Sequence, residues 1–310
     1  MLCLLHLCSS IITLANLRNH SPLRYPGGKA CLTNFITELA VLNGVHGGVY
    51  VELYAGGAGA ALNMLFNGIF RSIHINDFDY HVYSLWYSIL NHSEDFASRI
   101  IETEVSIDEW HRQQVIYKQG KSANIIDLGF ATFFLNRTNR SGIIFKAGPI
   151  GGIDQTGSYK IDVRFNKHDL IRRIQKIASY RDKIKLTNLD AVEIIQNIKT
   201  HHTTTEEIFL YLDPPYYKKG KFLYLNNYNH ADHLRLSHAV SNLTDIKWLI
   251  SYDNTIEIKE MYKNFRMSSF DLNYTLQSKK FGSELLVFSK NLRTSKSIKV
   301  NSRSSELVLL

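Results

Sequence analysis

Cysteine is scarce in this sequence, and its distribution excludes a protein built on disulfides. The 310 residues include three cysteines, Cys3, Cys8 and Cys31. An odd number near one end forms no disulfide framework, and no spacing of His and Cys resembles a zinc site. The pattern is typical of a reducing compartment, so we expect a cytoplasmic protein without a bound metal.

Long hydrophobic runs are missing as well. The apolar stretch at residues 1–17 lacks the basic region that begins a signal peptide, and it is too short and too polar to span a membrane. We interpret residues 1–20 as a disordered or loosely packed extension. A start codon assigned too early explains it better than a degenerate secretion signal. No other segment is apolar enough to cross a membrane, and no internal repeat is visible.

The composition favours a folded, basic protein. Hydrophobic residues make up 45% of the chain and aromatic residues 12%, which is enough for a sizeable core and excludes disorder throughout. The formal net charge is +8. This balance favours a polyanionic partner such as nucleic acid, but charge spread over the surface for solubility would explain it equally well.

Helix and strand patterns alternate in both halves of the chain. In the first half we expect helices at 30–42, 60–66 and about 80–90, and strands at 49–54 and 72–76. In the second half we expect helices at 167–179, 191–199 and 231–242, strands at 184–187, 208–212 and 248–252, and a hairpin with arms at 265–272 and 283–288. The alternation predicts an α/β fold with a doubly wound, mostly parallel sheet that ends in an antiparallel hairpin.

A polar stretch interrupts the alternation. Residues 92–166 begin with helical patterns and continue into a loop rich in Gly, Asn and Arg. We interpret them as a small inserted helical module within a sheet-forming domain made of residues 21–91 and 167–290. The tail at 291–310 is polar and basic, and we expect it to be disordered.

A glycine-rich turn follows the first predicted strand, within residues 52–59. Gly56, Gly57 and Gly59 allow a ligand to approach the backbone, and the next helix can hold an anionic group at its N-terminus. Asp77 ends the following strand, where a carboxylate can accept hydrogen bonds from ribose hydroxyls. The pattern differs from the dinucleotide signature, so it favours another nucleoside cofactor over a nicotinamide. A tight turn without a ligand is the alternative.

The segment Asp213-Pro214-Pro215-Tyr216 follows the apolar strand at 208–212 and therefore lies at the same sheet edge. The two prolines fix the backbone and remove two N–H donors. A carboxylate beside a fixed carbonyl can accept both protons of an amino group, which favours a pyramidal nitrogen whose lone pair points at an electrophile. Tyr216 offers a flat face on which a nucleic-acid base can stack. The alternative is an ordinary Pro-Pro turn.

Taken together, the motifs resemble the Dam-like family of DNA adenine methyltransferases. The order is Arg24-Tyr25-Pro26-Gly27-Gly28-Lys29, the turn at 52–59, a long insertion and the segment at 213–216, and the resemblance covers residues 21–290. It implies a Rossmann-like class I methyltransferase fold with S-adenosyl-L-methionine as cofactor. It also implies site-specific methylation of N6 of adenine in double-stranded DNA, by direct transfer to a flipped-out base.

The same resemblance assigns roles to individual residues. It implies cofactor contacts for Tyr25, Lys29, Glu52, Gly56, Gly57, Gly59, Asp77, Asp190 and Asp213. It implies a catalytic role for Asp213, Pro214 and Tyr216. The match at Asp190 is weaker than the others, because an Asp that caps the next helix has the same sequence pattern.

The insertion resembles the target-recognition module of the family. Its candidates for contacts with nucleic acid are Asn136, Arg137, Asn139, Arg140, Lys146 and Arg164, whose side chains suit phosphates and purine edges. Residues 143–152 differ from what the GATC-specific branch would show, so the target sequence stays open. The resemblance further implies a monomer of bacterial or phage origin. Such an enzyme serves restriction-modification beside a separate endonuclease, or DNA methylation alone.

Several alternatives remain. Cytosine N4, an RNA adenine and a protein glutamine all offer a planar amine, although Asp rather than Asn or Ser at 213, and the insertion, favour DNA adenine. A catalytically silent DNA-binding relative is a second alternative, and a nucleotide-dependent oxidoreductase is a weaker third. No cysteine lies near residue 213, so we expect no covalent intermediate of the kind used for carbon methylation.

Overall fold

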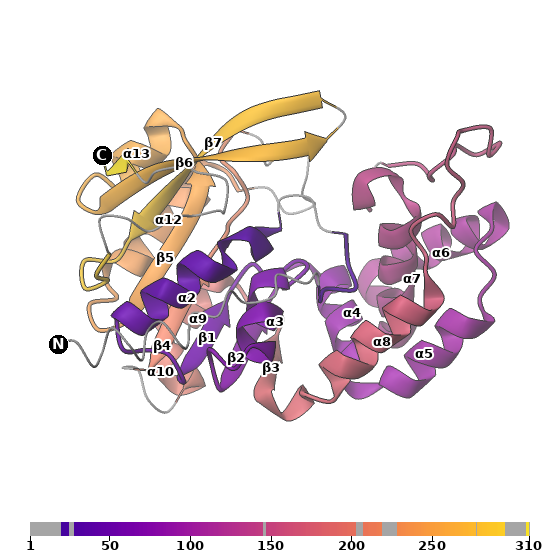
Figure 1. Ribbon diagram of the computed structural model, residues 1–310, viewed down its shortest axis with the longest axis horizontal. Coiled ribbons are helices and arrows are strands. Elements are labelled where there is room, and N and C mark those ends of the chain that lie inside the picture. Colours follow the sequence, from indigo (N-terminus) through magenta and orange to yellow (C-terminus); the bar gives the residue numbers. More distant parts are fainter. Residues whose placement is uncertain are drawn as a thin grey trace.

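The computed structural model describes residues 20–24, 28–144, 147–202, 207–218, 228–276, 278–294 and 308–309. A single mixed sheet forms the centre, and a group of helices lies beside it (Figure 1). The order of the strands is β3-β2-β1-β4-β5-β7-β6-β8. This order, with helices on both faces, confirms the predicted doubly wound α/β fold.

The strands fall into a parallel part and an antiparallel part. Their bounds are β1 Val49–Glu52, β2 Ser72–Asn76, β3 Ile184–Thr187, β4 Ile208–Leu212, β5 Lys247–Asp253, β6 Arg266–Leu276, β7 Ser278–Phe288 and β8 Val308–Leu309. The first five strands pair in parallel, whereas β7 runs antiparallel to both β5 and β6. The hairpin is therefore present with longer arms than predicted. The short strand β8 pairs with β6, in a tail that we expected to be disordered.

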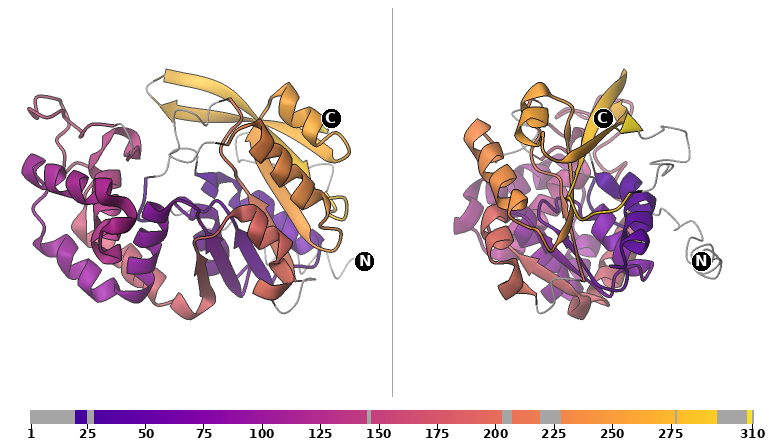
Figure 2. Two further views of the ribbon diagram at one scale, coloured as in Figure 1. Left: turned by 180° about the vertical axis from the view of Figure 1, so that it is seen from behind. Right: turned by 90° about the vertical axis from the view of Figure 1, so that its left-hand side faces the viewer.

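Helices cover both faces of the sheet. They include α2 Thr33–Leu42, α3 Gly59–Phe66, α9 Ala191–Gln196, α10 Ile198–His201, α12 His230–Ser241 and α13 Ile256–Met261, whereas α8 Lys167–Ala178 lies among the helices beside the sheet (Figure 1). The right-hand view of Figure 2 shows α2 on one side of the sheet and α12 on the other. Side chains alternate along β1, so Tyr50 enters one core, while Val49 and Val51 enter the other. Two buried faces explain why the strands read as continuous apolar runs.

The insertion forms a helical module next to the sheet. It contains α5 Ser93–Glu102, α6 Ile107–Gln119 and α7 Ile125–Thr138, together with the 3₁₀ turns η2 Gly120–Ser122 and η3 Arg140–Gly142. The helix α7 packs against α6 and against α4 Tyr80–Asn91, while α8 packs against α5. Phe96, Phe130 and Phe133 form part of the larger core, which extends from the sheet into the module. Among the described helices, none has the length and apolar character needed to span a membrane.

A pair of histidines, His74 buried and His202 half-buried, connects β2 with the end of α10. The Nδ1 atom of His74 lies 3.1 Å from Nε2 of His202, and its Nε2 atom lies 2.8 Å from Oγ1 of Thr187. Burial is the main cause that lowers the pKa of His74 to about 3 and the pKa of His202 to about 4. Both rings are therefore neutral at physiological pH, where one can donate to the other.

This pair of histidines predicts that the protein becomes less stable as the pH falls. The pKa values of both histidines in the folded chain lie below the ordinary 6.5, so the unfolded chain binds more protons as the pH falls from about 6.5 toward 4. We expect the free energy of unfolding to decrease over this range. His202→Gln should reduce that decrease by on the order of 1 kcal/mol, measured by denaturant unfolding at several pH values. His46→Gln, at an exposed site, is the control, and an unchanged pH dependence in His202→Gln would contradict the prediction.

Candidate active site

The sheet topology brings the predicted motifs to one edge. The strands β1 and β4 are parallel neighbours, and β2 lies on the other side of β1. The glycine-rich turn follows β1, Asp77 follows β2 and Asp213 follows β4. Because parallel strands end at the same edge, these segments come together despite their separation in sequence.

The glycine-rich turn is attached to Asp77. The backbone of Gly56 has a φ of +45°, which glycine adopts without strain. Its N–H donates to Oδ2 of Asp77 at 2.8 Å, and its carbonyl accepts from Nε1 of Trp86 at 2.9 Å. The other oxygen of Asp77 accepts from the N–H of Asp79 at 2.9 Å. Gly57 lies within the same turn, and Gly59 begins α3.

Asn76 holds the ends of three strands in place, although the sequence analysis did not single it out. Its Nδ2 atom donates to the carbonyls of Leu53 and Leu189, both at 3.0 Å. Its Oδ1 atom accepts from Thr187 and from the N–H of Leu189. The side chain of Asn76 is fully buried, so its hydrogen bonds satisfy polar atoms that water does not reach on the Asn76 side. An Asn at the end of an apolar strand is the only signal that could have pointed to it.

Two carboxyl groups at this edge have strongly raised pKa values. Burial is the main cause for Glu52, whose pKa rises to about 8, and the nearby charge of Asp213 adds to it. Its Oε2 atom accepts from the N–H of Ala61 at 3.1 Å, which fixes the first turn of α3. Burial, followed by the charge of Asp79, raises the pKa of Asp77 to about 7. Both groups therefore favour a partner that donates hydrogen bonds or carries positive charge.

The loop after β4 is held by two residues of β5. The Oδ1 atom of Asp213 accepts from Oγ of Ser251 at 2.6 Å. The carboxylate of Asp253 accepts from the N–H groups of Tyr217 and Lys218 at 2.8 and 2.9 Å. Sequence reasoning missed Ser251 and Asp253. Their alternation as polar residues at the end of an apolar strand was the available signal.

Lys29 connects the N-terminal motif with this loop. It begins the 3₁₀ helix η1 Lys29–Leu32, and its side chain is 4% exposed. Its Nζ atom lies 2.9 Å from Oδ2 of Asp213, 2.8 Å from the hydroxyl of Tyr216 and 3.7 Å from Oε1 of Glu284. The Tyr216 hydroxyl also donates to Glu284, a buried residue of β7 that the sequence analysis did not identify. Pro214 is buried, and Tyr25 lies outside the described residues.

Asp190 caps a helix in this structure. Its Oδ1 atom accepts from the N–H groups of Val192 and Glu193, at the start of α9. Its Oδ2 atom forms an ion pair with Arg235 at 2.9 Å. A contact with a cofactor is compatible with the remaining exposure of the side chain, 28%, and stays a prediction.

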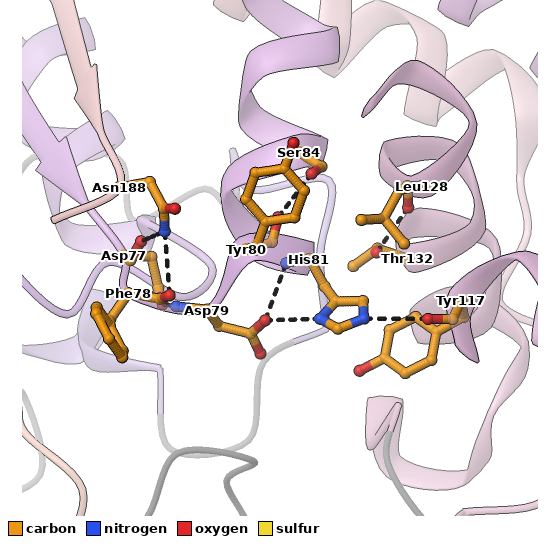
Figure 3. Close-up of polar contacts among 10 residues, drawn as sticks. All are labelled: Asp77, Phe78, Asp79, Tyr80, His81, Ser84, Tyr117, Leu128, Thr132 and Asn188. Carbon is orange, nitrogen blue, oxygen red and sulfur yellow. Dashed lines mark hydrogen bonds and ion pairs between the residues drawn. The ribbon is translucent and has the colours of Figure 1, made fainter. Parts of the chain in front are cut away.

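Figure 3 shows how this edge connects to the helical module. Asn188 donates to the carbonyls of Asp77 and Phe78, and Asp79 accepts from the ring of His81 at 2.9 Å. The other ring nitrogen of His81 lies 3.1 Å from the carbonyl of Tyr117, in α6. His81 therefore links the Asp79 carboxylate at the edge of the sheet to α6 of the module.

Two asparagines of the module are buried and bonded to the backbone. Asn136 accepts from the N–H of Arg24 at 2.8 Å and donates to the carbonyls of Arg24 and Gly142. Asn139 accepts from Nε1 of Trp110 at 2.7 Å and donates to the carbonyls of residues 143 and 144. Their amide groups shape the module, so base contacts by these residues remain without support.

Arginines gather near these asparagines. Arg137 donates to the carbonyl of Arg164, and Arg24 donates to the carbonyl of Asn139 at 3.3 Å. Burial and the charges of neighbouring arginines, Arg24 first, lower the pKa of Arg137 to about 10. Burial, followed by the charge of Arg164, lowers the pKa of Arg24. Arg140 and Arg164 are exposed, and Lys146 lies outside the described residues.

Metal ligands and thiols are two further kinds of group to consider near the loop. The parts of the chain that the structure describes contain no group of three or more His, Cys, Asp or Glu side chains that could hold a metal ion. Burial raises the pKa of Cys31 to about 11, so its thiol stays protonated. Among the described residues at this edge, the groups that can take part in chemistry include the carboxylates, Lys29 and Tyr216.

The profile of one protein family matches most of the chain. The D12 class N6 adenine-specific DNA methyltransferase family matches residues 25–276. No curated protein matches. Among solved structures, a candidate RNA methyltransferase from Pyrococcus horikoshii aligns with a TM-score of 0.40 and 12% identity over 94% of this chain and 99% of that one. The rRNA methyltransferase aviRa from Streptomyces viridochromogenes aligns with a TM-score of 0.39 and 10% identity, over 92% and 93% of the two chains.

The raised pKa of Glu52 predicts a cost in stability at neutral and higher pH. The folded chain keeps a proton up to about pH 8 that the unfolded chain releases near 4.5, so this contribution to stability is lost as the pH rises between these values. Glu52→Gln should therefore gain on the order of 1–3 kcal/mol relative to the native protein between about pH 5 and pH 8. Glu94→Gln, at an exposed site, is the control. The free energy of unfolding is measured for both proteins at about pH 5 and pH 8. The same difference between Glu52→Gln and the native protein at the two pH values would refute the prediction.

Proposed function

This chain belongs to the D12 class family of N6 adenine-specific DNA methyltransferases, and on that premise we propose that it transfers the methyl group of S-adenosyl-L-methionine to N6 of adenine in double-stranded DNA. The observation that carries the proposal is the position of Asp213. This carboxylate follows β4 at the edge where the glycine-rich turn and Asp77 also end. Acceptors for an amine and for a nucleoside cofactor therefore lie together at this edge of the sheet, where β1, β2 and β4 end. We call this edge the rim.

The groups around the glycine-rich turn suit a nucleoside that carries an amino-acid part. The partly exposed carboxylate of Asp77 can accept hydrogen bonds from ribose hydroxyls. The start of α3 offers backbone N–H groups to a carboxylate. Glu52, which keeps its proton up to about pH 8 in the protein alone, would become a carboxylate when an ammonium or sulfonium group binds beside it. When bound, the cofactor supplies an activated methyl group. The chain's own residues orient it toward residue 213.

The loop at 213–216 supplies the acceptors for the amine. In the proposed mechanism, one proton of the adenine amine is accepted by Asp213 and the other by a backbone carbonyl beside Pro214. Ser251 and Lys29 hold the Asp213 carboxylate by donating to it at 2.6 and 2.9 Å. Such prearranged acceptors stabilise the transition state because they need no reorganisation when the amine attacks. Contacts of Tyr216 with Lys29 and Glu284 fix the ring that would stack on the base.

The arginines of the module support DNA as the substrate. Arg137 donates to the carbonyl of Arg164, and burial, followed by the charges of neighbouring arginines, lowers the pKa values of Arg24 and Arg137. An anionic group placed between these side chains would offset their positive charges and accept their hydrogen bonds. Phosphates of a duplex that passes from the module to the rim meet this description.

Removal of the Asp213 carboxylate tests the chemistry. We expect Asp213→Ala to lose methyl transfer by about 100-fold or more, because an acceptor of the transition state is gone. Its affinity for S-adenosyl-L-methionine, measured by isothermal titration, should change much less. Asp182→Ala, at a site where the side chain is 96% exposed, is the control. The assay offers labelled cofactor with duplex DNA, RNA and protein; full activity of Asp213→Ala, or label only in RNA or protein, would overturn the proposal.

The cluster of Arg24, Arg137 and Arg164 predicts that the affinity for DNA decreases as the salt concentration rises. Arg164→Ala should weaken binding about equally for all sequences and lower the slope of log affinity against log salt by about 1 for each phosphate that the variant no longer neutralises. Arg181→Ala, an exposed arginine that pairs with Asp182, is the control. Fluorescence anisotropy with a labelled duplex at several salt concentrations measures both. A slope that stays the same in Arg164→Ala would exclude a phosphate contact at this residue.

A further inference from the structure

A connected group of four side chains lies under the rim and comes from three distant parts of the chain. Lys29 belongs to η1, Asp213 and Tyr216 to the loop after β4, and Glu284 to β7. Lys29 contacts Asp213 at 2.9 Å, Tyr216 at 2.8 Å and Glu284 at 3.7 Å, and Tyr216 donates to Glu284. The side chains of Lys29, Asp213 and Glu284 are 4%, 15% and 2% exposed. Water therefore screens their mutual interactions only weakly.

The formal charges of this group leave one negative charge in excess. Lys29 carries one positive charge, Asp213 and Glu284 each carry one negative charge, and Tyr216 is neutral. If Glu284 were absent, the ammonium of Lys29 would neutralise the Asp213 carboxylate that it touches. The charge of Glu284 therefore decides whether Asp213 presents a net negative field to its surroundings.

A net negative charge near the attacking nitrogen favours methyl transfer to an amine. The nitrogen lone pair forms the new C–N bond, while the C–S bond breaks and its electron pair stays on sulfur. Positive charge thus moves from sulfur to nitrogen, and the nitrogen then releases a proton, for which the hydrogen-bonded Asp213 carboxylate is the nearest acceptor before water. A net negative charge beside the nitrogen lowers the energy of this step, whereas a neutral Lys–Asp pair helps far less.

We propose that Glu284 is a positioning residue that balances the charge of Lys29 and fixes Tyr216, so that Asp213 keeps its negative charge for the attacking amine. This role rests on the proposed function and adds a residue that acts through two others. Glu284 lies opposite Asp253 in the antiparallel register of β7 with β5. The strand β7, which extends the sheet, therefore also completes the site. The antiparallel hairpin is therefore part of the catalytic design.

Glu284→Gln separates charge from shape. We expect its kcat for DNA methylation to fall by about 10-fold or more, while KM for DNA and affinity for the cofactor change by less than about threefold. Glu284→Asp keeps the charge and should recover part of the lost rate. Ser283→Ala, the neighbouring residue with an exposed side chain, is the matched control and should keep the native rate.

The pH profile distinguishes charge balance from a purely structural role. As the pH approaches about 10, where lysine loses its proton, Lys29 in Glu284→Gln becomes neutral and stops opposing Asp213. The ratio of native to variant kcat should therefore shrink steadily between about pH 7 and pH 9.5. The other titratable groups that face this cluster are present in both proteins: Cys31, Tyr50, Glu52, Tyr211 and Asp253. Glu52 has a pKa of about 8, so Glu284→Gln is also compared with the native protein in a Glu52→Gln background.

Each result has a defined meaning. A native rate in Glu284→Gln, or a rate ratio that does not change with pH, overturns the role of Glu284 and leaves the proposed function intact. Native protein that transfers no methyl group to duplex DNA overturns both. If Glu284→Gln does not fold, as judged by thermal unfolding, Glu284→Asp takes its place in the test. Because this variant keeps the negative charge, charge balance predicts that it keeps part of the native rate. A folded Glu284→Asp without activity would therefore also reject charge balance.

Discussion

The parallel pairing of β1 with β4 is the constraint on which the site depends. It places the turn after Glu52 and the loop that begins with Asp213 at adjacent strand ends, although 161 residues separate these two positions. Because β2 pairs with β1 in the same sense, Asp77 joins the same edge. The helical module is inserted between these two strands in sequence. The pairing of these strands therefore brings the parts of the site together.

Buried charge is concentrated at this edge. Glu52 and Asp77 have pKa values raised by burial, and Lys29 lies between the carboxylates of Asp213 and Glu284. Such groups reduce the stability of the protein without ligands, because each was taken out of water before its functional partner arrived. A cofactor with positive charge would offset part of that cost. The edge is thus arranged for binding at the expense of stability.

Helical module and sheet are joined through polar contacts as well as through the shared core. Asn136 bonds to the backbone of Arg24, only five residues before Lys29. Gly142 allows this contact, because a Cβ atom there would lie 2.1 Å from the carbonyl of Arg24. On the other side, His81 bridges Asp79 and α6. The module that carries the proposed DNA-binding arginines therefore contacts the sheet edge on two sides, near Arg24 and at Asp79.

Local patterns in the sequence determined the strands, the helices and the segments at 52–59 and 213–216, because periodic apolar residues, glycine turns and prolines act on their immediate neighbours. The sequence did not reveal Asn76, Ser251, Asp253 or Glu284 as parts of the site. It also suggested base contacts for Asn136 and Asn139, whose amides the structure uses inside the module. Only the tertiary structure decided these points. A contact such as that between Tyr216 and Glu284 depends on which strands are neighbours and in which register, and no local pattern of residues encodes that.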